Sequence, residues 1–346
     1  MRLYSLIFAV LKAVKNSIIL FFVIASFGCN NEIDINAPWK ETPVVNAFLD
    51  ASLSTQYFRI TKTFQNASNM TPQQAAQISD SLYFDTLIVN LTNTSTNQVY
   101  SFFKTTGLAK DPGYFANDKN ILYACNMTPD PKSSYKLDIF SPKSGNHYYS
   151  LSAVIEGAVI MPDNSPSSPF KITFNYDPMY GGWTNYNYIQ FTWSLAKNAA
   201  FYDAIIRYAY TENGVKKYLD QYIEANRVAT DQEINKNRIT YYSIHDYSLN
   251  KYLATVFNAT PFTGSRTMDS IYFVVVAGSN DLKTAVDYSK PNTSLLQVKP
   301  TFSNITGGAL GIFTSRNSKS LYVPFDPKPA YDSRKNLTIG VNGFPQ

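Results

Sequence analysis

Two-residue alternation of apolar and polar side chains is the main pattern in the first half of the chain after residue 43. Such alternation places one set of side chains on the buried face of a strand and the other set in solvent. Segment 135–140 shows it most cleanly, with Tyr135, Leu137 and Ile139 on one side. We therefore predict strands at 44–49, 57–62, 82–91, 98–103, 135–140 and 148–155.

Strand patterns resume after residue 170, and helical spacing is confined to short segments. The pattern predicts strands at 170–174, 189–193, 202–210, 217–225 and 270–278. Glu212-Asn213-Gly214 is typical of a hairpin turn between two of these strands. Short helices are predicted at 71–75, at 246–257 with Asp246 as the N-cap, and at 281–288. The predicted fold class is all-β, with two immunoglobulin- or fibronectin-III-like β-sandwich domains and a few short helices in the second.

A stretch rich in proline and serine, at 161–169, divides the chain near its middle. A chain of 346 residues also exceeds what one hydrophobic core commonly serves. We therefore predict an N-terminal sandwich domain at 44–160, a linker at 161–169 and a C-terminal sandwich domain at 170–346.

The first 28 residues have the order of a bacterial export signal. Arg2, Lys12 and Lys15 precede an apolar run at 18–27, which ends at Gly28-Cys29. The run has about ten residues, whereas a spanning helix needs about 20. Residues 26–29 resemble a lipobox, which makes Cys29 the predicted site of lipid attachment and 29–43 a lipid-anchored tether. The alternative is an ordinary signal that is cleaved near Ala25.

The residues that follow Cys29 bear on location. Asn30 differs from the aspartate that resembles an inner-membrane retention signal, and Glu32 and Asp34 resemble surface-export signals of Bacteroidetes lipoproteins. We expect lipid anchoring at the outer membrane, on its periplasmic or cell-surface face.

Composition narrows the classes of function. Charged residues make up 16% of the chain, against about 25% in typical domains, and aromatic residues reach 15%. Without the basic residues of the signal the chain is close to neutral, and its remaining lysines and arginines are scattered, so no nucleic-acid partner is expected. Cys125 is the second of two cysteines, and its apolar neighbours predict a small buried side chain.

Enzymatic signatures are weak, and we predict a non-enzymatic protein without metal or cofactor. His147 and His245 are the two histidines, and neither has metal-site spacing. His245 beside Asp246 leaves an envelope hydrolase open as a less favoured hypothesis, although no GxSxG elbow is present. A set of acidic residues around the predicted hairpin could likewise supply a carboxylate pair for glycoside hydrolysis, but we expect these residues to be solvated charges: Glu212, Asp220, Glu224, Asp231 and Glu233.

Aromatic side chains crowd a glycine-containing segment at 176–188, which is the predicted binding site. Exposed rings stack on sugars or anchor a protein partner because they bury a large area at small entropic cost. The alternative is that these residues pack as strand and rim residues. The predicted binding residues are Tyr180, Trp183, Tyr186 and Tyr188.

The segment Asn304-Ile305-Thr306-Gly307-Gly308-Ala309-Leu310-Gly311-Ile312-Phe313 is similar to a late segment of uncharacterised Bacteroidetes lipoproteins. The nearest family is the domain-of-unknown-function family 4249, and the similarity extends to 36–38, 56–62 and 191–210. Members are often encoded beside TonB-dependent outer-membrane receptors, so the resemblance implies an accessory role in uptake or envelope assembly. It supplies no catalytic residues.

Physically, the three glycines of this segment allow positive φ and close backbone approach, and we predict a structural turn there. The expected function is an accessory or binding subunit of an outer-membrane complex, with a TonB-dependent transporter as the candidate partner. The alternative is a surface glycan-binding module or adhesin.

Overall fold

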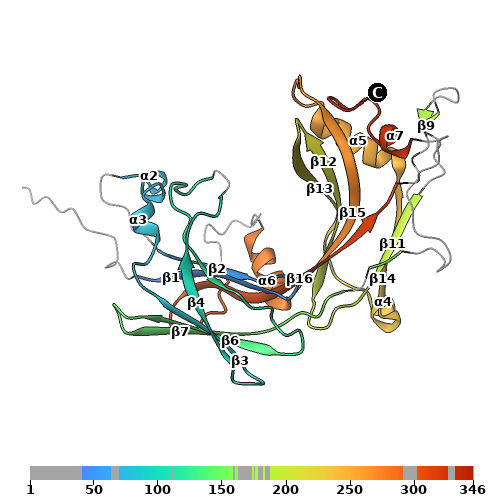
Figure 1. Cartoon of the computed structure of the whole chain (residues 1–346). Coiled ribbons are helices and arrows are strands. Elements are labelled where there is room, and N and C mark those ends of the chain that lie inside the picture. The colour runs from blue at the N-terminus through green and yellow to red at the C-terminus, as the bar shows by residue number, and fades with distance from the viewer. Residues whose placement is uncertain are drawn as a thin grey trace, which may run out of the picture. The chain divides into compact units, whose positions relative to one another are not determined.

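The computed structural model describes residues 41–63, 70–110, 113–158, 160–162, 174, 176–177, 182–183, 188–290, 302–325 and 332–345, a few of them by backbone alone. These residues belong to one compact unit, Glu41–Gln346. The chain is mostly β and builds one large mixed sheet (Figure 1). The predicted β-rich class is therefore confirmed in this coarser form.

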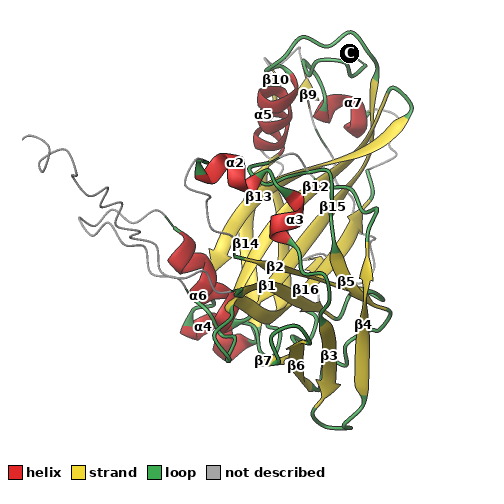
Figure 2. Ribbon diagram, turned by 90° about the vertical axis from the view of Figure 1, so that its left-hand side faces the viewer, coloured by secondary structure: helices red, strands yellow, loops and turns green. Residues whose placement is uncertain are grey.

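The large sheet has eleven strands, and its neighbours are antiparallel except for one parallel pair, β1 with β16. Figure 2 shows β12, β15 and β16 side by side, with helices around the strands. In spatial order the strands are β13 (Val215–Arg227), β12 (Phe201–Glu212), β15 (Arg266–Gly278), β16 (Leu310–Val323), β1 (Pro43–Asp50), β2 (Gln56–Lys62), β5 (Leu122–Cys125), β4 (Val99–Thr105), β3 (Ile88–Asn93), β6 (Ser134–Ser141) and β7 (Asn146–Ala153).

Two smaller sheets accompany it. One pairs β9 (Tyr176–Asp177) with β10 (Gly182–Trp183), and the other has the order β14 (Arg238–His245), β11 (Tyr188–Ser194) and β8 (Ile160–Pro162). The helices of the described residues are α2 (Pro72–Ala76), α3 (Ser79–Leu82), α4 (Asp231–Lys236), α5 (Asp246–Phe257), α6 (Asn280–Ser289) and α7 (Ser333–Leu337).

The local patterns placed most elements correctly. Thr71 caps α2 through a capping box with Gln74, and α5 and α6 cover the other two predicted helices, with α5 beginning at Asp246. The hairpin between β12 and β13 is confirmed, because Asn213 and Gly214 both adopt positive φ (51° and 81°), as a tight two-residue turn requires.

One predicted strand is wrong in its first half. The segment at 82–91 was expected to be extended throughout, but Leu82 ends α3 and β3 begins at Ile88. Leu82 and Tyr83 are buried with Ala116 in a small separate cluster. The packing of this segment therefore overrides its local preference for a strand.

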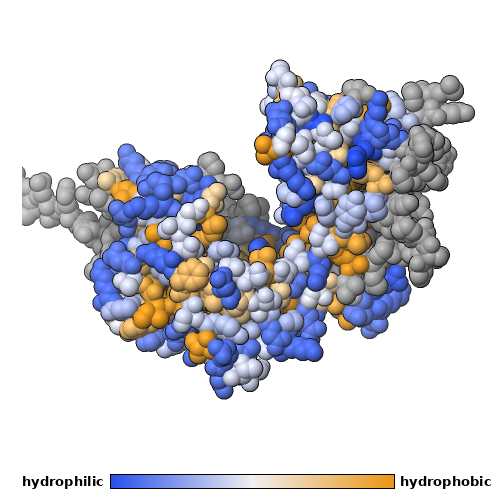
Figure 3. All heavy atoms as spheres, in the orientation of Figure 1, coloured by the Kyte–Doolittle hydropathy of each residue, from blue (hydrophilic) through white to orange (hydrophobic). Residues whose placement is uncertain are grey.

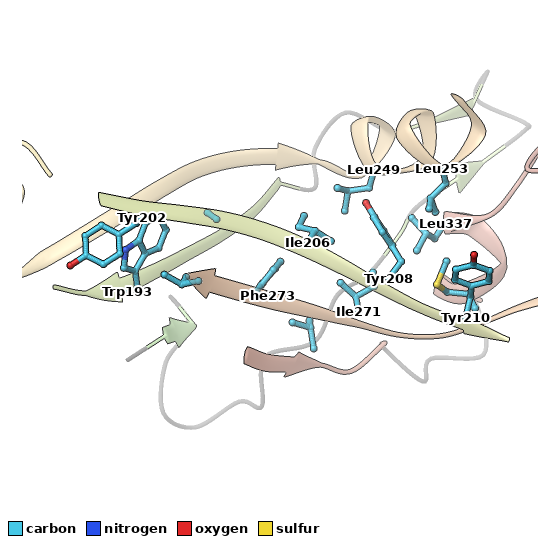
Figure 4. Close-up of a cluster of buried hydrophobic side chains, with 14 of the residues drawn as sticks. Trp193, Tyr202, Ile206, Tyr208, Tyr210, Leu249, Leu253, Ile271, Phe273 and Leu337 are labelled. Atoms are coloured by element: carbon cyan, nitrogen blue, oxygen red, sulfur yellow. The ribbon is translucent and has the colours of Figure 1, made fainter. Parts of the chain in front are cut away.

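Two large buried clusters lie among the described residues. The first includes Trp193, Tyr208 and Phe273, and α5 adds Leu249 and Leu253, whose side chains point toward the strands (Figure 4). The second is built on β1 to β7, and includes Phe58 stacked on Phe102 at a ring-centroid distance of 4.4 Å, with Leu91 and Phe313. The predicted domain boundaries stay a prediction, since most of the predicted linker lies outside the described residues.

Strand β16 contributes to both clusters, through Phe313 to the second and Val323 to the first. It pairs with β15 on one side and β1 on the other. The predicted glycine turn is therefore confined to 307–308, and the segment from Leu310 onward is a strand. Gly311 lies within it at a φ of 101°, directly against the backbone of Val45.

Cys125 is free and buried in β5, as its apolar neighbours predicted. Burial raises the pKa of its thiol, which disfavours the reactive thiolate. In a Cys29→Ser chain, where Cys125 is the sole thiol, we expect iodoacetamide labelling to be at least tenfold slower in native protein than in urea. Equal rates measured by mass spectrometry would show that β5 opens readily.

Candidate functional site

The outer face of strands β13, β12, β15 and β16 carries a set of tyrosines. Cross-strand register places Asp220, Arg207, Tyr272 and Tyr322 in one row across the four strands. Residues that are directly opposite in a sheet project to the same face. These four side chains are therefore neighbours on one surface, although Arg207 and Tyr322 are 115 residues apart in the chain.

Two further tyrosines flank this row on β13. Tyr218 is opposite Ala209, and Tyr222 is opposite Ile205, so both project to the same face as Arg207. Tyr218, Tyr222 and Tyr322 are 57%, 62% and 52% exposed, and Tyr272 is half-buried. We call Tyr218, Tyr222, Tyr272 and Tyr322 the tyrosine face.

Small and aliphatic residues form the floor of the tyrosine face. Ile205, Ala209 and Val274 project outward by register, yet they are almost fully buried. Alternate residues of the same strands, such as Ile206 and Phe273, belong to the first cluster on the opposite face. The sheet is thus apolar on both sides, and the outer floor is covered by the larger side chains around it.

A bidentate ion pair lies within the tyrosine face. Arg207 donates from Nε and Nη2 to the two carboxylate oxygens of Asp220, at 2.7 and 2.8 Å. These hydrogen bonds raise the pKa of Arg207. The guanidinium also lies 5.9 Å from the ring centroid of Tyr218, and Lys216 approaches the same ring at 5.8 Å. Such a bidentate pair offers a fixed arrangement of charge and hydrogen-bonding groups to a partner.

The rings of the tyrosine face are not coplanar. Tyr272 and Tyr322 have ring centroids 5.7 Å apart and an interplanar angle of 59°. On the side of the molecule that Figure 3 shows, apolar residues are scattered among hydrophilic ones. The surface is therefore irregular in shape and mixed in polarity.

The binding residues predicted from sequence are only partly described. Trp183 is half-buried against the first cluster, edge-on to Tyr176 at 5.4 Å and 6.5 Å from the ring of Tyr247. Tyr180 and Tyr186 lie outside the described residues, and Tyr188 is described only as the first backbone position of β11. The predicted aromatic binding site therefore stays a prediction, as does Cys29, which also lies outside the described residues.

The acidic residues considered for hydrolysis are mostly ion-paired. Glu212 binds Lys217 and Arg266, whereas Glu224 and Glu233 bind Arg227. Asp220 is held by Arg207, as described above. Four of the five carboxylates thus have a cation partner, and Asp231 lies in the first turn of α4.

His147 and His245 are the two histidines considered for metal binding or catalysis. His147 stacks on Phe140 at 4.4 Å and approaches Asp138 at 3.4 Å, while the side chain of His245 is outside the description. Within the described part of the chain, no group of three or more potential ligands is arranged for a metal ion.

Sequence reasoning missed the tyrosine face, although part of its signal is present. Tyr218, Asp220 and Tyr222 occupy every second position of β13, which marks one face of a strand as aromatic and polar. Tyr272 and Tyr322 carry no such signal, because their proximity depends on the β15–β16 pairing.

Comparison with known proteins adds no relative. No family model matches the chain, and no curated protein matches it. In the described residues, no helix combines the length and apolar character required to cross a membrane. The resemblance to family 4249 therefore stays a prediction from the residues that carry it.

Proposed function

We propose that this protein is a non-enzymatic cell-envelope lipoprotein that acts as an accessory subunit of an outer-membrane protein complex. Lipid on Cys29 anchors it, and the tyrosine face docks onto the partner protein. The candidate partner is a TonB-dependent transporter, which the resemblance to lipoproteins encoded beside such receptors supports. The export signal before Cys29 supports the location.

The observation that carries the proposal is the exposure of the tyrosine face. Tyr218, Tyr222 and Tyr322 are each more than half exposed on a floor of buried aliphatic side chains. Tyrosine and arginine are enriched at the energetic centres of protein interfaces, because they bury a large area and donate hydrogen bonds at low entropic cost. The Arg207–Asp220 pair places an arginine among the rings.

The geometry favours a protein over a glycan at this face. A sugar ring stacks flat on an aromatic face, whereas Tyr272 and Tyr322 are tilted by 59° to each other. Tilted rings around a fixed ion pair suit a protein surface with complementary relief and charge.

A glycan-binding module is the alternative, and the cluster around Trp183 supports it. Trp183 keeps part of its surface exposed and gathers Tyr176 and Tyr247 within 6.5 Å. This alternative places the ligand at β9–β10 and leaves the tyrosine face free, so mutation of the two surfaces separates the hypotheses.

We also propose a division of the chain into two domains. Two sandwich domains with a boundary at 161–169 are supported by the two separate buried clusters. The sharing of β16 between these clusters implies that the domains, if excised at that boundary, would each need this strand.

The test is crosslinking and affinity capture from envelopes of the native host. We expect wild-type protein to recover an outer-membrane receptor, and the double variant Tyr222→Ala, Tyr322→Ala to recover at least tenfold less, since truncation of interface centres costs about 2 kcal/mol or more. Tyr114→Ala is the matched control, because Tyr114 is 53% exposed on a loop outside the face. Thermal melting of both variants should match that of the wild type.

Equal recovery by the double variant would contradict docking through the tyrosine face. Loss of glycan binding in Trp183→Ala, with no receptor captured by the wild type, would replace the proposal with the glycan-binding alternative.

A further inference from the structure

A cavity of about 350 Å³ lies against the outer face of β1 and β2. Its second wall comes from Leu82 of α3, which packs against β2, from the adjacent Tyr83, and from Lys110 and Phe115. The size falls within the range of small-molecule sites. The cavity shares no lining residue with the tyrosine face, so ligand binding here would be independent of the proposed function.

Three cations line this cavity, and none of its described lining residues is acidic. Arg59 faces it from β2, directly opposite Asn46 of β1, while the intervening residues Phe58 and Ile60 are buried in the second cluster. Lys62 and Lys110 line it as well, and all three cations are half-buried. Strand alternation turns Arg59 away from the core and into the cavity, whereas Lys62 reaches it from the last position of β2 and Lys110 from beyond the end of β4.

The three cations have no carboxylate partner among the described residues. Arg59 donates from Nη2 to the amide oxygen of Asn120 at 2.9 Å, and Lys110 donates to the carbonyl oxygens of Phe115 and Ala116. The side chain of Lys62 has neither a hydrogen bond nor an ion pair with any described residue. By contrast, Arg207, Arg227 and Arg266 of the same chain are each paired with a carboxylate. Half-buried cations without a counter-charge are costly, and a bound anion relieves that cost.

The remaining wall is apolar and held in place. Leu82 and Tyr83 are almost fully buried, and Phe115 adds an exposed ring. The hydroxyl of Tyr83 donates to the carbonyl of Lys119 at 3.0 Å, so the residue offers the cavity its ring rather than a donor. A hydrogen bond from the amide of Ala116 to the carbonyl of Ala76 at 2.9 Å ties the loop to α2.

We infer that this cavity is a binding site for a small amphiphilic anion, with a carboxylate or phosphate head and an apolar body. The head lies between Arg59 and Lys62, and the body lies along Leu82, Tyr83 and Phe115. Arginine and lysine together bind such heads by charge-assisted hydrogen bonds, whereas the apolar wall excludes a fully hydrated ion.

Calorimetric titration of the full-length protein with decanoate tests the site, with decanol as the uncharged comparison. We expect decanoate to bind at least tenfold more tightly than decanol, and the double variant Arg59→Met, Lys62→Met to bind decanoate at least tenfold more weakly than the wild type. Lys132→Met is the matched control, because Lys132 is an exposed lysine outside the cavity.

Two results would overturn the inference. Either wild-type protein binds decanoate no better than decanol, or the double variant binds decanoate as well as Lys132→Met while its circular dichroism and melting temperature match those of the wild type. A further variant, Leu82→Ala, should weaken decanoate while leaving the preference over decanol intact. Receptor capture should be unaffected by Arg59→Met, Lys62→Met, which distinguishes a failure here from a failure of the proposed function.

Discussion

Replacing Gly311 by alanine is expected to destabilise the protein by about 3 kcal/mol, enough to lower its melting temperature by several degrees. A Cβ at this position would lie 2.8 Å from both the amide nitrogen and the carbonyl carbon of Val45, and closer still to the carbonyl oxygen. The φ of 101° adds backbone strain for any side chain. Gly311 pairs with Val45 in the parallel β1–β16 ladder, so a side chain there would force these two strands apart within the continuous sheet.

Gly308→Ala is the matched control for this prediction. Gly308 also has positive φ, at 87°, but a Cβ there would meet nothing within 4 Å. We expect it to cost about 1 kcal/mol, from backbone strain alone. Urea denaturation followed by circular dichroism measures both variants. If Gly311→Ala were no less stable than Gly308→Ala, the result would contradict the close approach of β16 to β1 at Gly311.

The difference between these glycines also shows what sequence could predict of the fold. The glycines at 307, 308 and 311 correctly indicated positive φ, and close backbone approach is found at 307 and 311. They did not indicate that a fourteen-residue strand follows, because β16 is stabilised by partners more than 250 residues away in β1. Hairpins such as β12–β13 were predictable, since their turn residues and alternation are local.

The candidate sites show the same division between local and long-range information. The alternation in β13 indicates which of its residues share a face, but the contact between Tyr272 and Tyr322 depends on strand pairing. Likewise, Arg59 and Lys110 are unremarkable as isolated basic residues, and only the packing of α3 and its neighbouring loop against β2 brings them to one cavity. Sequence patterns therefore do not predict surfaces that are assembled from strands far apart in the chain.

Replacing Cys29 by alanine is expected to abolish lipid labelling and to release the protein from membranes. The prediction depends on the apolar run at 18–27 followed directly by Gly28-Cys29. Two or more acyl chains on one cysteine give stable anchoring, since each buried methylene contributes about 0.8 kcal/mol, whereas the variant would have none. Metabolic labelling with a fatty acid in a native-type host, with and without globomycin, measures the modification, and fractionation measures the release.

Cys125→Ser is the control that separates lipid attachment from general thiol chemistry. Cys125 is buried in β5, so its replacement should leave both labelling and membrane association intact. Labelling that is lost in Cys29→Ala, retained in Cys125→Ser and blocked from maturation by globomycin would support a lipidated N-terminus. A wild-type chain without label, recovered as soluble secreted protein, would instead favour cleavage near Ala25. In that case the tyrosine face would have to hold the protein at its partner without help from a lipid, and capture of the receptor should then weaken on dilution.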